Sequence, residues 1–357
     1  MHGATKVALF VVLATLGGGA VYAALHPRVL PAVRPVATAA SVPSAAPAAA
    51  PGTVFDPLSP DRPAWVDASR AAPAGDWVKA RPAFQYSHTI AQRGGADPCA
   101  TPTGDTSSYS NWVPLIQGHF MAPRELELDA SGHFDLVIHL HGDELARREL
   151  LKSEQHFVLY ALTLNLNQSY APLFSGSFLF DAIIAGIEQN LSKNLGKPAQ
   201  VGHIAFSAWS AGFVGIEAAL SQPFANRIDG ALLIDGLHAP RNDPKAFQEQ
   251  LKPFVEFAAR AAAKERFFFV SHSSIDPADF ASTTECAHYL ISSTGGRPEP
   301  VKRDDPLGLE LVESFNRGDF NVRGYAGNDK ADHCAQLGAL RSAYAALGRR
   351  WHAAPAR

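Results

Sequence analysis

The pentapeptide Ala208-Trp209-Ser210-Ala211-Gly212 stands between two apolar stretches and decides how the rest of the chain is interpreted. Residues 201–206 predict a strand, and residues 213–220 carry apolar side chains at the spacing of a short buried helix. A tight junction between a strand and a helix holds its central residue at positive φ, which costs a non-glycine residue roughly 1–3 kcal/mol. The residues two before and two after Ser210 come close in such a bend, and both are small. We therefore expect a strained serine at the N-terminus of a helix.

Strands and helices are predicted to alternate on both sides of this stretch. Apolar runs predict strands at residues 112–116, 125–128, 134–140, 157–164, 230–234, 267–270 and 320–325. Helical periodicity and capping signals predict helices at residues 144–154, 177–191, 243–263, 282–292 and 337–351. This alternation favours an α/β class with a mostly parallel sheet and helices on both faces. In such sheets the chemistry gathers at the carboxyl ends of the strands.

The small-x-Ser-x-Gly pattern around Ser210 resembles the nucleophile elbow of the α/β-hydrolase family, with alanine in place of the first glycine. The resemblance covers about residues 112–357 in element order. It implies an α/β-hydrolase fold and a serine hydrolase of the esterase or lipase kind. No cofactor is implied, and the expected partner is a small-molecule or lipid-like ester substrate.

The family order of serine, acid and histidine assigns a role to each candidate residue. Ser210 is the expected nucleophile, and His333, between the last predicted strand and the last helix, is the expected proton acceptor and donor. Two aspartates can supply the acid. Asp235 ends a wholly apolar strand and needs a strong partner if it is buried, so we prefer it. Asp276, which follows the next strand in a polar segment, is the alternative.

The resemblance also indicates where an oxyanion would bind. One donor would be the N–H of Ala211, and the other an N–H of the turn at Gly142-Asp143, which resembles the family's His-Gly loop without its glycine run. Residues 165–175 and 295–318 are expected to shape the pocket.

Two other function classes remain open at this point. His139, His141 and Asp143 alternate at a strand end, so a metal-dependent hydrolase could use them as ligands. Further ligands could come from the other histidines among the 14 of the chain, which include His203, His238, His272 and His288. The other class is a non-catalytic α/β-hydrolase-like protein that binds a ligand of the cell envelope. The altered elbow and oxyanion loop are the features that favour it.

Composition excludes some partners. The 357 residues are 46% hydrophobic, enough for one large core, and 31 basic against 34 acidic residues give a net charge of −3. No basic footprint for nucleic acid is present. Three cysteines, Cys99, Cys286 and Cys334, allow one disulfide in an oxidising compartment and leave its pairing open. The oligomeric state is open as well.

The N-terminal region predicts export. Residues 1–25 contain Lys6 followed by an apolar run, which fits either a cleaved signal peptide or a membrane anchor. Residues 26–59 are rich in alanine and proline and predict an extended linker. Residues 60–111 predict an irregular extension packed on the domain of residues 112–357. We therefore expect a protein that is periplasmic, secreted or tethered to the membrane.

Overall fold

The fold is taken from a computed structural model of the chain, in which residues 97–100, 106–164, 170–277, 279–305, 307–327 and 329–353 are described. All of them belong to the second of two units into which the chain divides, Gly52–Arg357. The predicted signal or anchor at residues 1–25, the linker at 26–59 and most of the extension at 60–111 lie outside the described residues. Within the described ranges, no helix combines the length and the apolar character that a membrane span requires.

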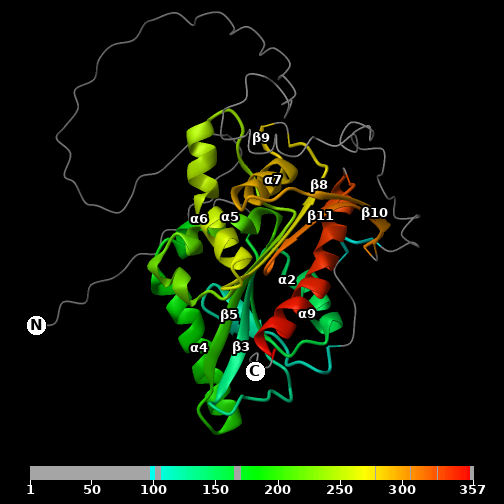
Figure 1. Ribbon diagram of the computed structural model, residues 1–357. Coiled ribbons are helices and arrows are strands. Elements are labelled where there is room, and N and C mark those ends of the chain that lie inside the picture. Colours follow the sequence, from blue (N-terminus) through cyan, green and yellow to red (C-terminus); the bar gives the residue numbers. More distant parts are fainter. Residues whose placement is uncertain are drawn as a thin grey trace, which may run out of the picture. The chain divides into compact units, whose positions relative to one another are not determined.

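The centre of the fold is a ten-stranded sheet with the order β1-β2-β4-β3-β5-β6-β8-β12-β11-β10 (Figure 1). The strands from β4 to β12 in this order pair in parallel, and the pairs at both edges are antiparallel. The bounds are β1 Val113–Leu115, β2 Gly118–Met121, β3 His133–Leu140, β4 Val158–Leu162, β5 Gln200–Trp209, β6 Gly230–Ile234, β8 Phe267–Ser273, β10 Glu299–Asp304, β11 Glu310–Arg317 and β12 Phe320–Tyr325. Two short strands, β7 (Ala239–Pro240) and β9 (Phe280–Ala281), form a separate pair.

Helices cover both faces of the sheet and bury a separate apolar core on each. Their bounds are α2 Asp143–Ser153, α3 Tyr170–Phe174, α4 Ser177–Leu195, α5 Phe213–Leu220, α6 Pro244–Ala262, α7 Thr283–Ser293, α8 Lys330–Ala335 and α9 Ala339–Trp351. The larger core packs helices α3 to α7 on one face, and the smaller core packs α2 and α9, which lie side by side, on the other (Figure 1). This arrangement confirms the predicted α/β class.

Local sequence explains why these elements begin where they do. The strands β6 and β8 are buried along their whole length, as expected for strands covered on both faces. The carboxylate of Asp243 accepts hydrogen bonds from the N–H groups of Lys245 and Ala246 and so caps α6, which has a proline in its first turn. Ser282 and Glu285 form a reciprocal capping box at the start of α7.

The edges of the sheet differ from the sequence prediction. The strand predicted at residues 125–128 is wrong, because this segment is irregular and the edge strand before it is β2. Gly118 opens β2 because a Cβ there would lie 2.4 Å from the carbonyl oxygen of Ala161. Residues 295–318 are not simply a loop, since they contain β10 and β11, which extend the sheet beyond β12.

A disulfide bond joins the segment before β1 to the end of the domain. Cys99 pairs with Cys334, 235 positions later, and Cys286 is a buried free thiol. In the described part of the extension, Tyr109 belongs to the smaller core, and its hydroxyl donates to the carbonyl oxygen of Gln155, 2.7 Å away.

Candidate active site

Ser210 follows β5 at a sharp bend. Its φ of +49° lies in the left-handed region, and the chain continues through the 3₁₀ turn Ser210–Gly212 into α5. Gly212 is necessary at this bend, because a Cβ there would lie 2.2 Å from the carbonyl oxygen of Leu140 at the end of β3. The first N–H groups of such a turn have no partner within the helix. The N–H of Ala211 therefore belongs to a positively polarised helix start beside the serine.

Asp235 occupies the same place on the neighbouring strand. It follows β6, has φ +43° and is 1% exposed. Gly236 lets the two bends touch, because a Cβ at this position would lie 2.3 Å from the carbonyl oxygen of Ser210. His141, after β3, has φ +74°. The adjacent strands β3, β5 and β6 thus all end in a strained non-glycine residue, and such strain is typical of functional sites.

His333 lies in α8, after β12. Asp329 caps this helix, and the indole nitrogen of Trp209 donates to the His333 carbonyl oxygen at 3.1 Å. The Nδ1 of His333 lies 2.7 Å from Oδ2 of Asp235, and the histidine side chain is 22% exposed. The imidazole thus joins a buried carboxylate to solvent-accessible space.

The Asp235 carboxylate is fully hydrogen-bonded. Its Oδ1 accepts from the Ser273 N–H at 2.8 Å and from the Thr283 hydroxyl at 3.0 Å. Burial raises the pKa of Asp235. This effect is outweighed by the hydrogen bond and charge of His333 and by the hydrogen bonds from Ser273 and Thr283, so the net pKa lies below the usual value. The carboxylate is therefore ionised at neutral pH and suited to orient an imidazole.

Ser210, Asp235 and His333 line one cavity of about 350 Å³. The wall is completed by His238, Ser273, Ile275, Pro277, Thr283, Asp329 and Lys330. Sequence reasoning did not assign His238, Ser273 or Thr283 to the site. The start of α7 was predicted from its capping residues, but its closeness to Asp235 depends on contacts between distant parts of the chain.

The alternative acid lies elsewhere. A carboxylate oxygen of Asp276 is 2.6 Å from the guanidinium of Arg241, and this side chain is 40% exposed. Asp276 thus pairs with Arg241, whose side chain is only 8% exposed, and not with His333. The geometry thus favours Asp235 over Asp276 as the residue that orients the imidazole.

The turn predicted to supply the second oxyanion donor is already hydrogen-bonded. The N–H groups of Gly142 and Asp143 both donate to the hydroxyl oxygen of Thr163, at 3.1 and 3.2 Å. The imidazole of His141 stacks on Trp209, with ring centroids 5.3 Å apart, and lies 3.0 Å from the Tyr170 hydroxyl. The ring of His141 thus supports the turn, as expected for a structural residue.

The predicted metal ligands His139, His141 and Asp143 do not meet at one point. The two ring nitrogens of His139 lie 2.8 Å from the Ser207 hydroxyl and 2.8 Å from the His141 carbonyl oxygen. The carboxylate of Asp143 instead pairs with His119 at 3.1 Å. Burial lowers the pKa of His139 to about 4, so it is a neutral core residue. The alternation at this strand end is therefore not a metal site.

The described parts of the two segments expected to shape the pocket do not line this cavity. Of residues 165–175, the stretch 165–169 lies outside the described residues, and the described remainder forms α3 and does not line the cavity. Residues 295–318 belong mainly to the sheet edge, and none of those described lines the cavity. The cavity is enclosed instead by the loops after β6 and β8 and by the starts of α7 and α8.

Comparison with known proteins gives structural neighbours only. No protein-family model and no curated protein matches the sequence. Similar solved structures include a cold-adapted esterase from an Arctic intertidal metagenomic library, with 14% identity over 64% of this chain and 90% of that chain and a TM-score of 0.35. An ester hydrolase from the metagenome of Lake Arreo has 15% identity over 80% and 95%, with a TM-score of 0.40. The ferric enterobactin esterase of Salmonella typhimurium has 11% identity over 69% and 60%, with a TM-score of 0.38.

The fold is assigned from the molecule itself. The parallel strands β4-β3-β5-β6-β8-β12 carry a bend with a serine after β5, an aspartate after β6 and a histidine after β12. These positions follow the chain order Ser, Asp, His that accompanies a nucleophile elbow. This chain has the α/β-hydrolase fold.

Proposed function

We propose that the protein is a serine hydrolase that cleaves a carboxylic ester through a covalent acyl-enzyme. The observation that carries this proposal is the 2.7 Å contact between Asp235 and His333 on the wall of the cavity that Ser210 also lines. A buried carboxylate, an imidazole and a hydroxyl in this order are the parts that acyl transfer to serine requires.

The proposed reaction begins with attack of the Ser210 hydroxyl oxygen on the ester carbonyl carbon. His333 takes the hydroxyl proton on Nε2, while its Nδ1–H donates to Asp235, which stabilises the imidazolium. When the tetrahedral intermediate collapses, the bond between the carbonyl carbon and the alcohol oxygen breaks, and the imidazolium protonates the leaving alcohol. Water then repeats the sequence on the acyl-enzyme and releases the acid.

The N–H of Ala211 is the first proposed oxyanion donor. The Ala211 N–H stands at the helix start beside Ser210, where negative charge develops. The N–H groups of Gly142 and Asp143 serve only after leaving the Thr163 hydroxyl. Because one donor is typically worth about 3–4 kcal/mol of transition-state stabilisation, the proposed site depends on this rearrangement for its full rate.

The cavity favours a small substrate. Its volume of about 350 Å³ is near the lower end of the range for ligand sites, about 300–1,000 Å³. Ile275 and Pro277 give its wall an apolar part, and His238 and Lys330 give it a polar part. A short acyl ester fits this volume better than a long lipid chain. Esters are preferred to thioesters and amides because of the family resemblance.

Labelling with a fluorophosphonate tests the proposal. The probe should attach to Ser210 in the peptide map, and Ser210→Ala should abolish both the adduct and ester turnover. Ser273→Ala is the matched control, because Ser273 lines the same cavity and holds Asp235 through its main-chain N–H, which alanine retains. Two outcomes contradict the proposal and favour the non-catalytic binding alternative. Either the folded wild type gains no adduct at Ser210, or Ser273→Ala loses the adduct as completely as Ser210→Ala does.

We further propose that the protein is exported. The apolar N-terminal stretch and the disulfide between Cys99 and Cys334 support this, because structural disulfides persist mainly in oxidising compartments. Fractionation of expressing cells, with intact-mass measurement of the recovered chain, tests the proposal. Protein that accumulates in the cytosol with both cysteines reduced contradicts it.

A further inference from the structure

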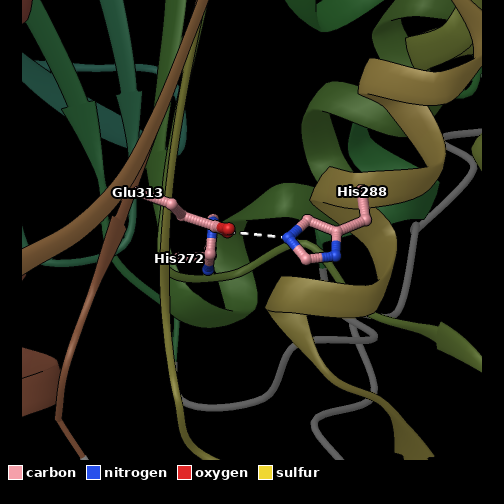
Figure 2. A group of neighbouring side chains, drawn as sticks. All are labelled: His272, His288 and Glu313. Carbon is pink, nitrogen blue, oxygen red and sulfur yellow. Dashed lines mark hydrogen bonds and ion pairs between the residues drawn. The ribbon is translucent and has the colours of Figure 1, made fainter. Parts of the chain in front are cut away.

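A second cluster of chemically active side chains lies in the sheet beyond the proposed site. His272 in β8, His288 in α7 and Glu313 in β11 each direct one ligand atom into a common space, and these atoms all lie within 4.8 Å of one another (Figure 2). The side chains of His272 and Glu313 are 3% and 1% exposed, and that of His288 is 24% exposed. None of the three lines the cavity beside Ser210.

The sheet leaves a gap for this cluster at Gly324. This residue lies in β12, between its partners His272 in β8 and Glu313 in β11. A Cβ at Gly324 would lie 2.4 Å from Cε1 of His272 and 2.5 Å from Cγ of Glu313. Any other residue would fill the space across which the imidazole and the carboxylate meet. The glycine thus brings two polar side chains together inside the sheet.

Hydrogen bonding determines which nitrogen of His272 is available. The hydroxyl of Thr284 donates to the Ser273 carbonyl oxygen at 2.7 Å, so its oxygen accepts a hydrogen bond from the Nδ1–H of His272, 2.9 Å away. In the neutral imidazole, Nε2 then carries a lone pair. Histidine ligands in metal sites are oriented in the same way, because the ring nitrogen that does not bind the metal donates its N–H to a neighbouring oxygen, here that of Thr284.

The atoms in the common space are incompletely satisfied. Nε2 of His272 lies 2.7 Å from Oε1 of Glu313, but the ring does not direct an N–H at that oxygen, so Nε2 has no hydrogen-bond partner among the described residues. Oε2 of Glu313 is likewise buried without such a partner in the described part of the chain. Figure 2 shows the Glu313 carboxylate joined to His288, where Nε2 is also 2.7 Å from Oε1. A lone pair and an anionic oxygen at this distance repel each other unless a cation lies between them.

The charge of the cluster points the same way. The Glu313 carboxylate is 1% exposed and has no Lys or Arg partner among its ion pairs with the described residues, only the two histidines. A buried carboxylate anion needs a compensating positive charge. Either protons on the histidines or a bound metal ion can provide it, and a metal ion can in addition bind the second buried oxygen of Glu313, which has no hydrogen-bond partner among the described residues.

We propose that His272, His288 and Glu313 bind one Zn²⁺ ion. Two imidazole nitrogens and a carboxylate oxygen suit zinc and leave a fourth position for water. Zinc bonds of about 2.0–2.2 Å place tetrahedral ligand atoms roughly 3.3–3.6 Å apart. The two contacts of 2.7 Å to Glu313 therefore open by more than half an ångström when the ion enters. His288 is the most exposed of the three ligands.

The ion would join β11 to two elements of the proposed active site, β8 and α7. His272 directly precedes Ser273, and Thr284 directly follows Thr283, the two residues that donate to Asp235. Zinc at this position therefore cross-links β8, β11 and α7 just outside the cavity. It stabilises the fold and does not itself contact the substrate.

Metal binding to the full chain, produced without a histidine tag, tests this inference. The protein is stripped with a chelator, titrated with zinc chloride by calorimetry and analysed for bound zinc after dialysis. We expect one ion per chain at micromolar concentration or below and a higher unfolding temperature with zinc. His288→Gln should weaken binding at least about 100-fold. The matched control His133→Gln, which removes a histidine paired with Asp129, should bind like the wild type.

Two results would overturn the inference: no zinc bound by the folded wild type, or equal binding by wild type and His288→Gln. Either result means that the cluster is an internal ion-pair network only. If His288→Gln does not fold, Glu313→Gln and the visible spectrum of the cobalt-substituted wild type decide. Tetrahedral cobalt absorbs strongly and octahedral cobalt weakly, so a weak spectrum also counts against the site. These readouts are independent of ester turnover, and failure of the serine hydrolase proposal leaves them unchanged.

Discussion

Asp235 is the residue on which the proposed chemistry depends most. It accepts from Ser273 and Thr283 through one oxygen and faces Nδ1 of His333 through the other. In Asp235→Asn, an amide N–H facing His333 would move the imidazole proton to Nε2, where it blocks uptake of the serine proton. The opposite amide orientation would lose the Ser273 and Thr283 bonds. We expect kcat for ester hydrolysis to fall by a factor on the order of 10³–10⁴.

Asp276→Asn is the control for this experiment. Its carboxylate pairs with Arg241, and neither residue lines the cavity beside Ser210, so turnover should stay within a few-fold of the wild type. Initial rates on a short-chain ester, with folding checked by circular dichroism, measure both variants. Equal and slight slowing by the two substitutions would show that neither carboxylate orients His333.

Sequence patterns were informative for residues that stand at strand ends. Ser210, Asp235 and His333 could be selected because each follows a strand of a parallel sheet, and the ends of such strands meet at one edge. Glu313 could not be selected, because it lies within β11, a strand that was not predicted. Its approach to His272 depends on the pairing of β8, β12 and β11 and on the missing side chain of Gly324. No local pattern encodes a contact of this kind.

Among the elements of the proposed site, the ends of β5 and β6 touch at Gly236. A methyl group at Gly236 would overlap the Ser210 carbonyl oxygen, so Gly236→Ala must push the two bends apart. We expect unfolding to become easier by about 1–3 kcal/mol, as for other overpacked positions. Turnover should fall at least about 10-fold, since a misplacement of one ångström can cost about 10²-fold.

Gly176→Ala is the matched control for Gly236→Ala. No atom lies within 4 Å of a Cβ at Gly176, and its φ of −157° is open to alanine. Urea unfolding and kcat should both match the wild type in this variant. If Gly236→Ala is also indistinguishable from the wild type, the contact between the bends does not position Ser210.

The central elements were predictable, and the edges were not. The strand β6 was predicted with its observed bounds, and α6 with its Asp243 cap, because apolar runs and capping residues act locally. The edge strands β2, β10 and β11 are short or rich in polar residues, so they lack the apolar run on which the prediction relied. Their strand conformation comes from pairing with neighbours that lie far away in the sequence.

For the whole molecule, stability should fall between acidic and mildly alkaline pH because of Glu217. Burial of this side chain on α5 raises its pKa to about 7, against a small opposing effect of Gln250. A raised carboxyl pKa means that the folded state holds a proton which the unfolded state releases. The contribution is therefore complete below the unfolded-state pKa and is lost as pH rises through about 7.

Glu217→Gln should remove this dependence. We expect the variant to exceed the wild type in unfolding free energy by on the order of 1–2 kcal/mol at pH 8, after allowance for partial exposure, and to match it near pH 4. Chemical denaturation at both pH values measures the difference. A constant difference across this range would mean that Glu217 titrates normally in the folded protein.

The disulfide between Cys99 and Cys334 should be the largest single stabilising link of the described domain. It closes a loop of 235 positions and is adjacent to His333, so it ties the segment at Cys99 to the helix that carries the imidazole. Chain-entropy arguments give about 5 kcal/mol for so long a loop, and measured values are typically about 2–4 kcal/mol. We expect the double variant Cys99→Ser/Cys334→Ser to lose about 2–5 kcal/mol of unfolding free energy in urea denaturation. A reducing agent should destabilise the wild type by a similar amount and leave the double variant unchanged. If the reducing agent affects both proteins equally, the stabilisation comes from something other than this bond, because the remaining cysteine, Cys286, is a buried free thiol.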